Sequence, residues 1–520
     1  MVMPMPTSRH PTSPRLRCVV TGATGYIGGR LVPRLLDAGH EVRCLVRDPR
    51  KLRDVPWAGQ VEISPGDVLD EAALRRALAG ADVLYYLVHS MSGPDFAARD
   101  RRAALLTAQA AREAGLRRII YLGGLHPDGG SAELSEHLGS RTEVGEIFLR
   151  SGVPSAVLQA AVVIGSGSAS FEMLRHLTER LPLMITPRWV RNRVQPIAIR
   201  DVLHVLVAAA TLPEDVNRTF DIGGPDVLTY QEMIQRFAAL TGLPRRGMLP
   251  VSVLSPWLSS HWINIVTPVP KSIGGPLIES LIHEAVCRED DIARYIPEPP
   301  GGWTSYDTAV RLAMRKINLG EVETHWSAAS VDGSPSDPLP TDPGWSGGSW
   351  YVDQRVRRTD APAGDVWRVV KGIGGRNGWY SFPLAWAARG WADRLAGGVG
   401  LRRGRRHPHQ LRVGEALDWW RVEELHEDAE SHLLRLRAEM KVPGAAWLEL
   451  AVVPCSGGGA EYRQRAVFIP HGLAGHLYWW AVAPFHGPVF GGMTRNIVRT
   501  AEAIAGLNPD RRTAWRWPSR

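Results

Sequence analysis

The order of hydrophobic and polar residues changes character after the midpoint of the 520-residue chain. In the first part, short runs of Val, Ile and Leu alternate with Ala-, Leu- and Arg-rich segments whose apolar residues recur at helical spacing. This alternation is typical of βαβ units and predicts an α/β fold, a doubly wound parallel Rossmann sheet with helices on both faces. The predicted strands are 17–20, 41–46, 61–64, 82–88, 118–122 and 156–159.

The second part follows a different pattern. Polar and apolar residues alternate over longer segments, which is typical of antiparallel strands with one face buried. A helical segment is predicted at 494–505, so we expect an α+β domain in which an antiparallel sheet packs on a helix. The predicted strands are 419–425, 433–440, 447–453 and 462–468.

A segment rich in Ser, Pro, Gly and Asp separates the two parts and has the composition of a linker. We therefore expect a dinucleotide-binding domain with a small substrate lobe, followed by a second domain. The predicted division is a flexible tail at 1–14, the first domain at 15–326, the linker at 327–349, the second domain at 350–506 and a tail at 507–520.

Composition supports the same division. The net charge is +8, but residues 345–520 alone hold 25 Lys and Arg against 16 Asp and Glu, and 13 of the 19 Trp. Only five of the 61 basic residues are Lys, so the Arg bias is general. The one dense basic run, Arg402 to His407, has no interleaved aromatic residues, and we expect no nucleic-acid partner.

The cysteines argue for a reducing compartment. Four Cys lie far apart and form no C-x-x-C pair, which disfavours a disulfide framework and a thiolate metal site, and we expect a cytoplasmic protein without a metal. The apolar stretch at 477–490 is interrupted by Pro484 and Pro488 and is shorter than the roughly 20 residues that span a bilayer, so no transmembrane span is expected.

A glycine-rich loop connects the first predicted strand to a helix. Its pattern, G-x-x-G-x-x-G, sits between strand and helix as a dinucleotide site requires: the turn is tight, the backbone approaches a pyrophosphate, and the helix N-terminus attracts the anion. Pro33 does not suit the interior of the following helix. The predicted cofactor-binding residues here are Thr21, Gly22, Thr24, Gly25, Tyr26, Ile27 and Gly28.

The end of the second strand bears on the choice of cofactor. Asp48 stands where an NAD site needs a carboxylate for the ribose, but Arg47 precedes it and is suited to the 2′-phosphate of NADP. We favour NADP over NAD, with Arg47 as its ligand. Alternatively, Asp48 caps a short helix at Pro49 and Arg47 is a solvated surface residue. Asp67, after the third strand, is predicted to lie near the adenine.

Four segments together resemble the extended and atypical short-chain dehydrogenase/reductases, including epimerase-like and complex I subunit-like NAD(P)-binding proteins. They are TGATGYIGG at 21–29, GDV at 66–68, QPIAIRDV at 195–202 and FDIGGP at 220–225, and the resemblance covers 15–314. It implies a Tyr-x-x-x-Lys pair on a helix, in which Lys lowers the pKa of the Tyr acid/base, and a Ser or Thr on the preceding strand.

The chain departs from that pattern at each position. Gly123 and Gly124 end the strand where Ser is expected, and His137 and Arg141 replace Tyr and Lys with the same spacing. We interpret His137 as acid/base and Arg141 as the residue that orients the ribose, with His89 near the nicotinamide. Alternatively, the catalytic pair is lost and both side chains bond locally. Tyr121, the other hydroxyl nearby, is read as a core aromatic.

The second domain resembles a domain of uncharacterised function found fused to such dehydrogenases in bacteria and related to the helix-grip fold. The resemblance implies a pocket for an apolar ligand. Core packing is the alternative for its tryptophans, such as Trp419 and Trp480. The matching segments are GGRNGW at 374–379, GGVGLRR at 397–403, AEMKVPG at 438–444 and FIPHGL at 468–473.

These observations lead to one functional hypothesis and two alternatives. The leading hypothesis is an oxidoreductase that transfers hydride from NADPH to a small, apolar molecule that the second domain covers or delivers. The first alternative is a non-catalytic NADPH-binding redox sensor or assembly factor. The second, a nucleotide-sugar epimerase, requires the Tyr that is missing.

Overall fold

The computed structural model describes residues 15–53, 55–89, 95–125, 135–251, 267, 275, 277, 279, 282–319, 350–381, 410–428 and 430–507. The predicted linker and tails, residue 507 apart, and the Arg402 to His407 run lie outside these residues. The chain divides into two compact units, Met1–Gly348 and Ser349–Arg520, which are described separately.

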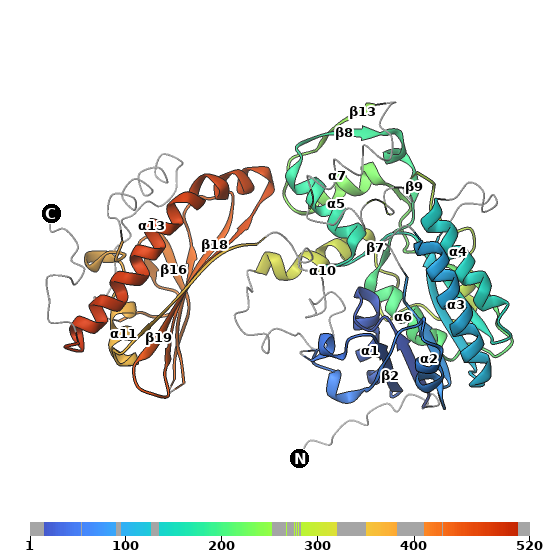
Figure 1. The fold of residues 1–520 in the computed structure, drawn as a ribbon. Coiled ribbons are helices and arrows are strands. Elements are labelled where there is room, and N and C mark those ends of the chain that lie inside the picture. The colour runs from blue at the N-terminus through green and yellow to red at the C-terminus, as the bar shows by residue number, and fades with distance from the viewer. Residues whose placement is uncertain are drawn as a thin grey trace, which may run out of the picture. The chain divides into compact units, whose positions relative to one another are not determined.

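The first unit is built on a seven-stranded parallel sheet (Figure 1). Its order is β11-β6-β5-β4-β1-β2-β3, so the order reverses between β1 and β4, and the predicted doubly wound Rossmann sheet is confirmed. The strand at 218–222 was not predicted. The strands are β1 Arg17–Thr21, β2 Glu41–Val46, β3 Glu62–Pro65, β4 Val83–Tyr86, β5 Arg118–Gly124, β6 Ser155–Ala160 and β11 Arg218–Ile222.

Helices cover both faces of this sheet (Figure 1). Two, α1 Tyr26–Asp37 and α6 Ile199–Ala209, pack on one face and share a large apolar core with it. Three others, α2 Glu71–Leu78, α3 Phe96–Glu113 and α4 Glu136–Leu149, share the core of the opposite face. Burial on both faces explains why the strands read as continuous apolar runs.

Pro33 lies inside α1 without breaking it. A proline at this position cannot donate a hydrogen bond to the carbonyl of Gly29, four residues earlier. The buried indole of Trp57 donates to that carbonyl instead, with Nε1 3.1 Å from the oxygen. The conflict noted in the sequence is therefore resolved by a side chain from a different segment.

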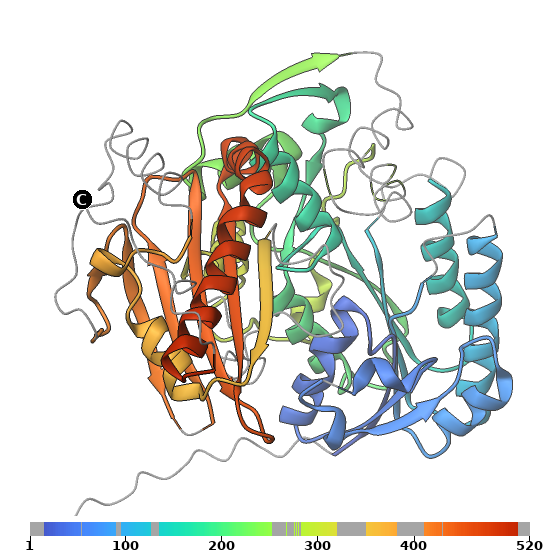
Figure 2. The same cartoon turned by 60° about the vertical axis from the view of Figure 1, so that its left-hand side comes forward.

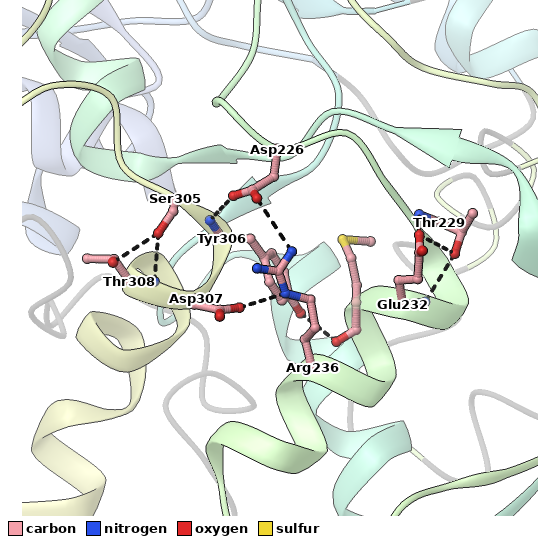
Figure 3. A network of polar contacts seen from close by, with 9 residues as sticks. Asp226, Thr229, Glu232, Arg236, Ser305, Tyr306, Asp307 and Thr308 are labelled. Atoms are coloured by element: carbon pink, nitrogen blue, oxygen red, sulfur yellow. Dashed lines mark hydrogen bonds and ion pairs between the residues drawn. The ribbon is translucent and has the colours of Figure 1, made fainter.

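In the described residues, the remaining part of the first unit forms a small lobe that contains the two-stranded sheets β10-β7, β12-β9 and β13-β8 and the α-helices α5, α7 and α10. Thr229 and Glu232 form the capping box that opens α7, and Arg236 joins Asp226 to Asp307 of α10 (Figure 3). The elements are β7 Val163–Ile164, α5 Ala169–Arg180, β8 Leu183–Pro187, β9 Arg193–Val194, β10 Ile197–Ala198, β12 Leu228–Thr229, α7 Tyr230–Leu240, β13 Gly247–Val251 and α10 Tyr306–Leu319.

The second unit is a six-stranded antiparallel sheet with helices on one face (Figures 1 and 2). Its order is β14-β19-β18-β17-β16-β15, which confirms the expected antiparallel α+β domain. The elements are β14 Tyr351–Thr359, α11 Ala363–Lys371, β15 Ala416–Leu417, β16 Trp420–Glu427, β17 His432–Ala438, β18 Gly444–Pro454, β19 Ala460–Pro470 and α13 Gly472–Ile504.

The helix α13 begins 22 residues before the predicted start at 494. Pro484 and Pro488 interrupt the sequence pattern, but α13 continues through both, and both prolines lie on the exposed side of the helix. Trp419 is buried, as the core interpretation holds, whereas Trp480 is exposed. No helix among the described residues is long and apolar enough to cross a membrane.

Candidate functional site

The glycine loop occupies the space between β1 and α1, and two of its glycines leave no room for a side chain. Gly22 has a φ of +78°, and a Cβ there would lie 2.7 Å from the carbonyl oxygen of Leu87. A Cβ on Gly28 would lie 2.2 Å from the carbonyl oxygen of Gly22, so the helix packs directly on the turn. The cradle that a pyrophosphate requires is therefore present.

Polar groups fix this loop at the point where the strand order reverses. The Thr21 hydroxyl donates to the Tyr85 carbonyl and accepts from the N–H of Leu87, both at 3.2 Å. Gly25 is exposed, Thr24 and Ile27 are half-buried, and the first turn of α1 has no acidic residue. The N-terminus of α1 is therefore electrostatically suited to an anion.

Residues 165–168, which were not predicted as part of the cofactor site, also border this loop. Arg30 donates to the carbonyls of Tyr26 and Ser166, at 3.1 and 3.4 Å, and its guanidinium lies 4.3 Å from the centre of the Tyr26 ring. A Cβ on Gly165 would lie 2.3 Å from the Tyr26 hydroxyl. The run of small residues at 165–168 was the feature of the sequence that could have indicated this contact, because small residues permit the close approach to Tyr26.

Near the end of β2, some charged side chains already bind other groups of the protein. Asp48 accepts the Arg50 backbone N–H at 3.1 Å and both Nε and Nη2 of Arg50, at 2.9 and 3.1 Å. The Arg50 side chain lowers the pKa of Asp48. Arg43 is buried and donates to the carbonyls of Ala77 and Ala79. Arg47, in contrast, is 82% exposed, with its Nε 4.0 Å from Asp67.

His89, His137 and Arg141 lie at the carboxyl ends of β4 and β5. The rings of His89 and His137 are 5.9 Å apart between centroids, and His137 is 4% exposed. Arg141 donates through Nη2 to the Leu122 carbonyl at 2.9 Å, and a Cβ on Gly124 would lie 3.7 Å from its Nε. The structure thus brings together the three residues that the sequence selected for this end of the sheet.

Burial and charge determine the protonation of His137. Desolvation first, and the positive charge of Arg141 second, lower its pKa from 6.5 to about 4. The imidazole is therefore neutral near pH 7. The hydroxyl of Tyr121 donates to the backbone carbonyl of Arg141 at 3.2 Å, so this buried tyrosine is used within the fold.

Comparison with known proteins identifies the first unit. Residues 22–148 match the family model described as NAD(P)H-binding. A reductase from Streptomyces griseus, which acts on (4-alkanoyl-5-oxo-2,5-dihydrofuran-3-yl)methyl phosphate, is 32% identical over 235 residues, 44% of this chain and 75% of the relative. The chain belongs to the atypical short-chain dehydrogenase/reductases.

Two further proteins are similar in sequence to this short-chain dehydrogenase/reductase. An NAD(P)H azoreductase from Xenophilus azovorans is 28% identical over 231 residues, 44% of this chain and 75% of that protein. Subunit 9 of the NADH dehydrogenase [ubiquinone] 1 alpha subcomplex from mouse is 26% identical over 255 residues, 47% of this chain and 65% of the subunit. The resemblance to complex I subunit-like proteins is thereby confirmed.

The second unit has a family match of its own. Residues 345–493 match the model described as a protein of unknown function (DUF2867), which confirms a separate uncharacterised domain fused to the short-chain dehydrogenase/reductase. The finer relation to a helix-grip fold stays a prediction.

Proposed function

We propose that this chain is an NADPH-dependent reductase. The observation that carries the proposal is the position of His137, Arg141 and His89 at the carboxyl ends of β4 and β5. The glycine loop follows β1, the neighbour of β4 in this parallel sheet, so loop and cluster share one edge. The glycine loop would hold the pyrophosphate of the dinucleotide, and the three residues at this edge would face the substrate.

The charged groups after β2 support NADPH over NADH. The carboxylate of Asp48, which an NADH site would use for the ribose hydroxyls, already binds Arg50 through three hydrogen bonds. The guanidinium of Arg47 is exposed and suited to a forked contact with a 2′-phosphate. Asp67, within 4.0 Å of Arg47, is proposed to border the adenosine.

In the reaction that we propose, the nicotinamide supplies hydride to an electrophilic carbon of the substrate. Neutral His137 donates its N–H to the substrate oxygen, because a pKa of about 4 leaves only about one imidazole in a thousand protonated at pH 7. The guanidinium of Arg141, held by the Leu122 carbonyl, stabilises the negative charge that develops on that oxygen. The proton that completes the reduction arrives from water.

We propose that the substrate is a small apolar molecule and that the protein acts in the cytoplasm. All four cysteines are free, which suits a reducing compartment.

Turnover and binding of NADPH, measured separately, test the reductase proposal. NADPH consumption is followed with quinone and unsaturated-lactone acceptors, and NADPH affinity by calorimetry. His137→Ala should lower turnover by about 10²–10⁴-fold while leaving the dissociation constant for NADPH within a few-fold. His426→Ala, an exposed histidine of the second unit, is the control. Loss of NADPH binding in His137→Ala, or unchanged turnover, would contradict the assigned role.

One observation favours a second function, a non-catalytic NADPH-binding sensor or assembly factor. Gly124 occupies the position of the expected Ser, and His137, which replaces the Tyr, is nearly inaccessible to water. Under this alternative the protein binds NADPH but consumes none with any acceptor class, and His137→Ala changes neither property.

A further inference from the structure

The first half of α13 presents a broad apolar surface that is separate from the dinucleotide site. Leu477, Trp480 and Phe485 are 60%, 68% and 65% exposed. The exposed residues Leu473, Leu477, Trp480, Pro484 and Pro488 follow one another at intervals of three or four residues, so they lie on one side of the helix, and Phe485 lies next to Pro484. We call the exposed side of this half the α13 face, which consists of Leu473, Leu477, Trp480, Ala481, Pro484, Phe485 and Pro488.

Contacts on the opposite side hold the helix in this orientation. His476 is buried and its Nδ1 lies 2.8 Å from the Tyr351 hydroxyl on β14. Trp479 stacks on the Tyr351 ring with centroids 4.9 Å apart. A Cβ on Gly475 would lie 2.4 Å from the Pro443 carbonyl oxygen, so the helix rests directly on the chain beneath it. Rotation that buried the α13 face would break these contacts.

The charge distribution indicates what this face binds. No Asp, Glu, Lys or Arg occurs from Gly472 through Thr494, so the first two thirds of α13 carry no carboxylate, ammonium or guanidinium group. Residues 345–520 have a net charge of +9, of which +5 belongs to residues 382–409 and +3 to residues 508–520, both outside the described residues. An apolar helix face rich in Trp, Phe and Leu on a basic domain is the combination that binds the surface of an anionic bilayer.

We propose that α13 docks the protein on an anionic lipid surface by inserting this face among the headgroups and upper acyl chains. Leu473 to Pro488 extends over about 22 Å at 1.5 Å per residue, long enough to lie along the interface. No helix in the described part of the chain is suited to span a bilayer, so the attachment is peripheral and reversible. The proposal does not depend on reductase activity.

Sedimentation of the full chain with vesicles tests the proposal. The vesicles contain phosphatidylcholine and phosphatidylglycerol at about 3:1, with pure phosphatidylcholine for comparison. The test variant combines Leu477→Glu, Trp480→Glu and Phe485→Glu. The matched control adds the same charge at exposed apolar positions elsewhere, Leu105→Glu, Val227→Glu and Val413→Glu.

The wild type and the control should sediment with anionic vesicles, and the α13 variant should partition at least about tenfold more weakly. A wild type that stays in the supernatant would overturn the proposal, as would an α13 variant that sediments like the wild type. Gel filtration tests whether a second copy of the chain covers the α13 face instead. If the wild type is a dimer that does not bind vesicles, and the α13 variant is a monomer, the face is a dimer interface and the lipid proposal is wrong. Unchanged melting temperatures show that the variants fold.

Discussion

Arg47 and Asp48 are adjacent but differ in their contacts, because Asp48 accepts three hydrogen bonds from Arg50 whereas Arg47 is 82% exposed. The sequence presents both as candidates, because a carboxylate and a guanidinium at the end of β2 favour different dinucleotides. The three hydrogen bonds from Arg50 to Asp48 favour the arginine, and they accompany the short helix Pro49–Leu52 that Asp48 caps. The sequence alone cannot show whether the side chains of Asp48 and Arg50 bind each other or are separately solvated.

Arg47→Ala should therefore weaken NADPH binding by about tenfold and leave NADH binding nearly unchanged, because only NADPH offers a 2′-phosphate to the guanidinium. Calorimetric titration with each dinucleotide measures the difference. Arg76→Ala, an exposed arginine on α2, controls for loss of one positive charge. Equal weakening for both dinucleotides would argue against a contact with the 2′-phosphate.

His137 should make stability depend on pH. Its pKa is about 4 in the folded protein and near 6.5 in the unfolded chain. Between these values the unfolded chain binds a proton that the folded protein does not, so the free energy of unfolding decreases as the pH falls from 6.5 to 4, by roughly 3 kcal/mol when complete.

Urea unfolding of the wild type and His137→Gln at pH 7 and near pH 4.5 measures this contribution. The variant should lose less stability on acidification than the wild type, whatever its stability at pH 7. Parallel losses in the two proteins would show that His137 does not have the lowered pKa.

Secondary-structure elements with a clear local sequence pattern were predicted correctly, whereas a helix that depends on contacts with distant segments was missed in part. The strands of the βαβ units were found because burial on both faces leaves uninterrupted apolar runs. The first 22 residues of α13 were missed because Pro484 and Pro488 are helix breakers by propensity. Packing against β14 and β19 supports the helix there, and no sequence window includes that packing.

Trp57 and Pro33 illustrate the same dependence within α1. The Trp57 indole donates a hydrogen bond to the Gly29 carbonyl, which Pro33 cannot do. Trp57→Phe should therefore lower the free energy of unfolding by about 1 kcal/mol more than the smaller side chain alone would, because this hydrogen bond is also lost. In a Pro33→Ala background the new backbone N–H reaches Gly29, and the same substitution should cost less. A double-mutant cycle measures the coupling. Equal costs in both backgrounds would exclude the compensation.

The whole molecule consists of two units that differ in both core and charge. Residues 1–344 hold 36 Lys and Arg against 37 Asp and Glu, whereas 345–520 have a net charge of +9. Among the described residues, each buried hydrophobic cluster belongs to one unit: three to the first unit and one to the second unit. The basic character of the chain is therefore a property of the second unit alone.

Because residues that share a core unfold cooperatively, two units with separate cores should unfold in two transitions. The NADPH site that we propose lies in the first unit, and NADPH at about 100 times its dissociation constant should stabilise that unit by roughly 2.7 kcal/mol. Differential scanning calorimetry should therefore show one transition that moves several degrees upward with NADPH and one that stays in place. Gly28→Ala, whose Cβ would lie 2.2 Å from the Gly22 carbonyl oxygen, should abolish the movement. A single transition, or equal movement of both, would mean that the two units unfold as one.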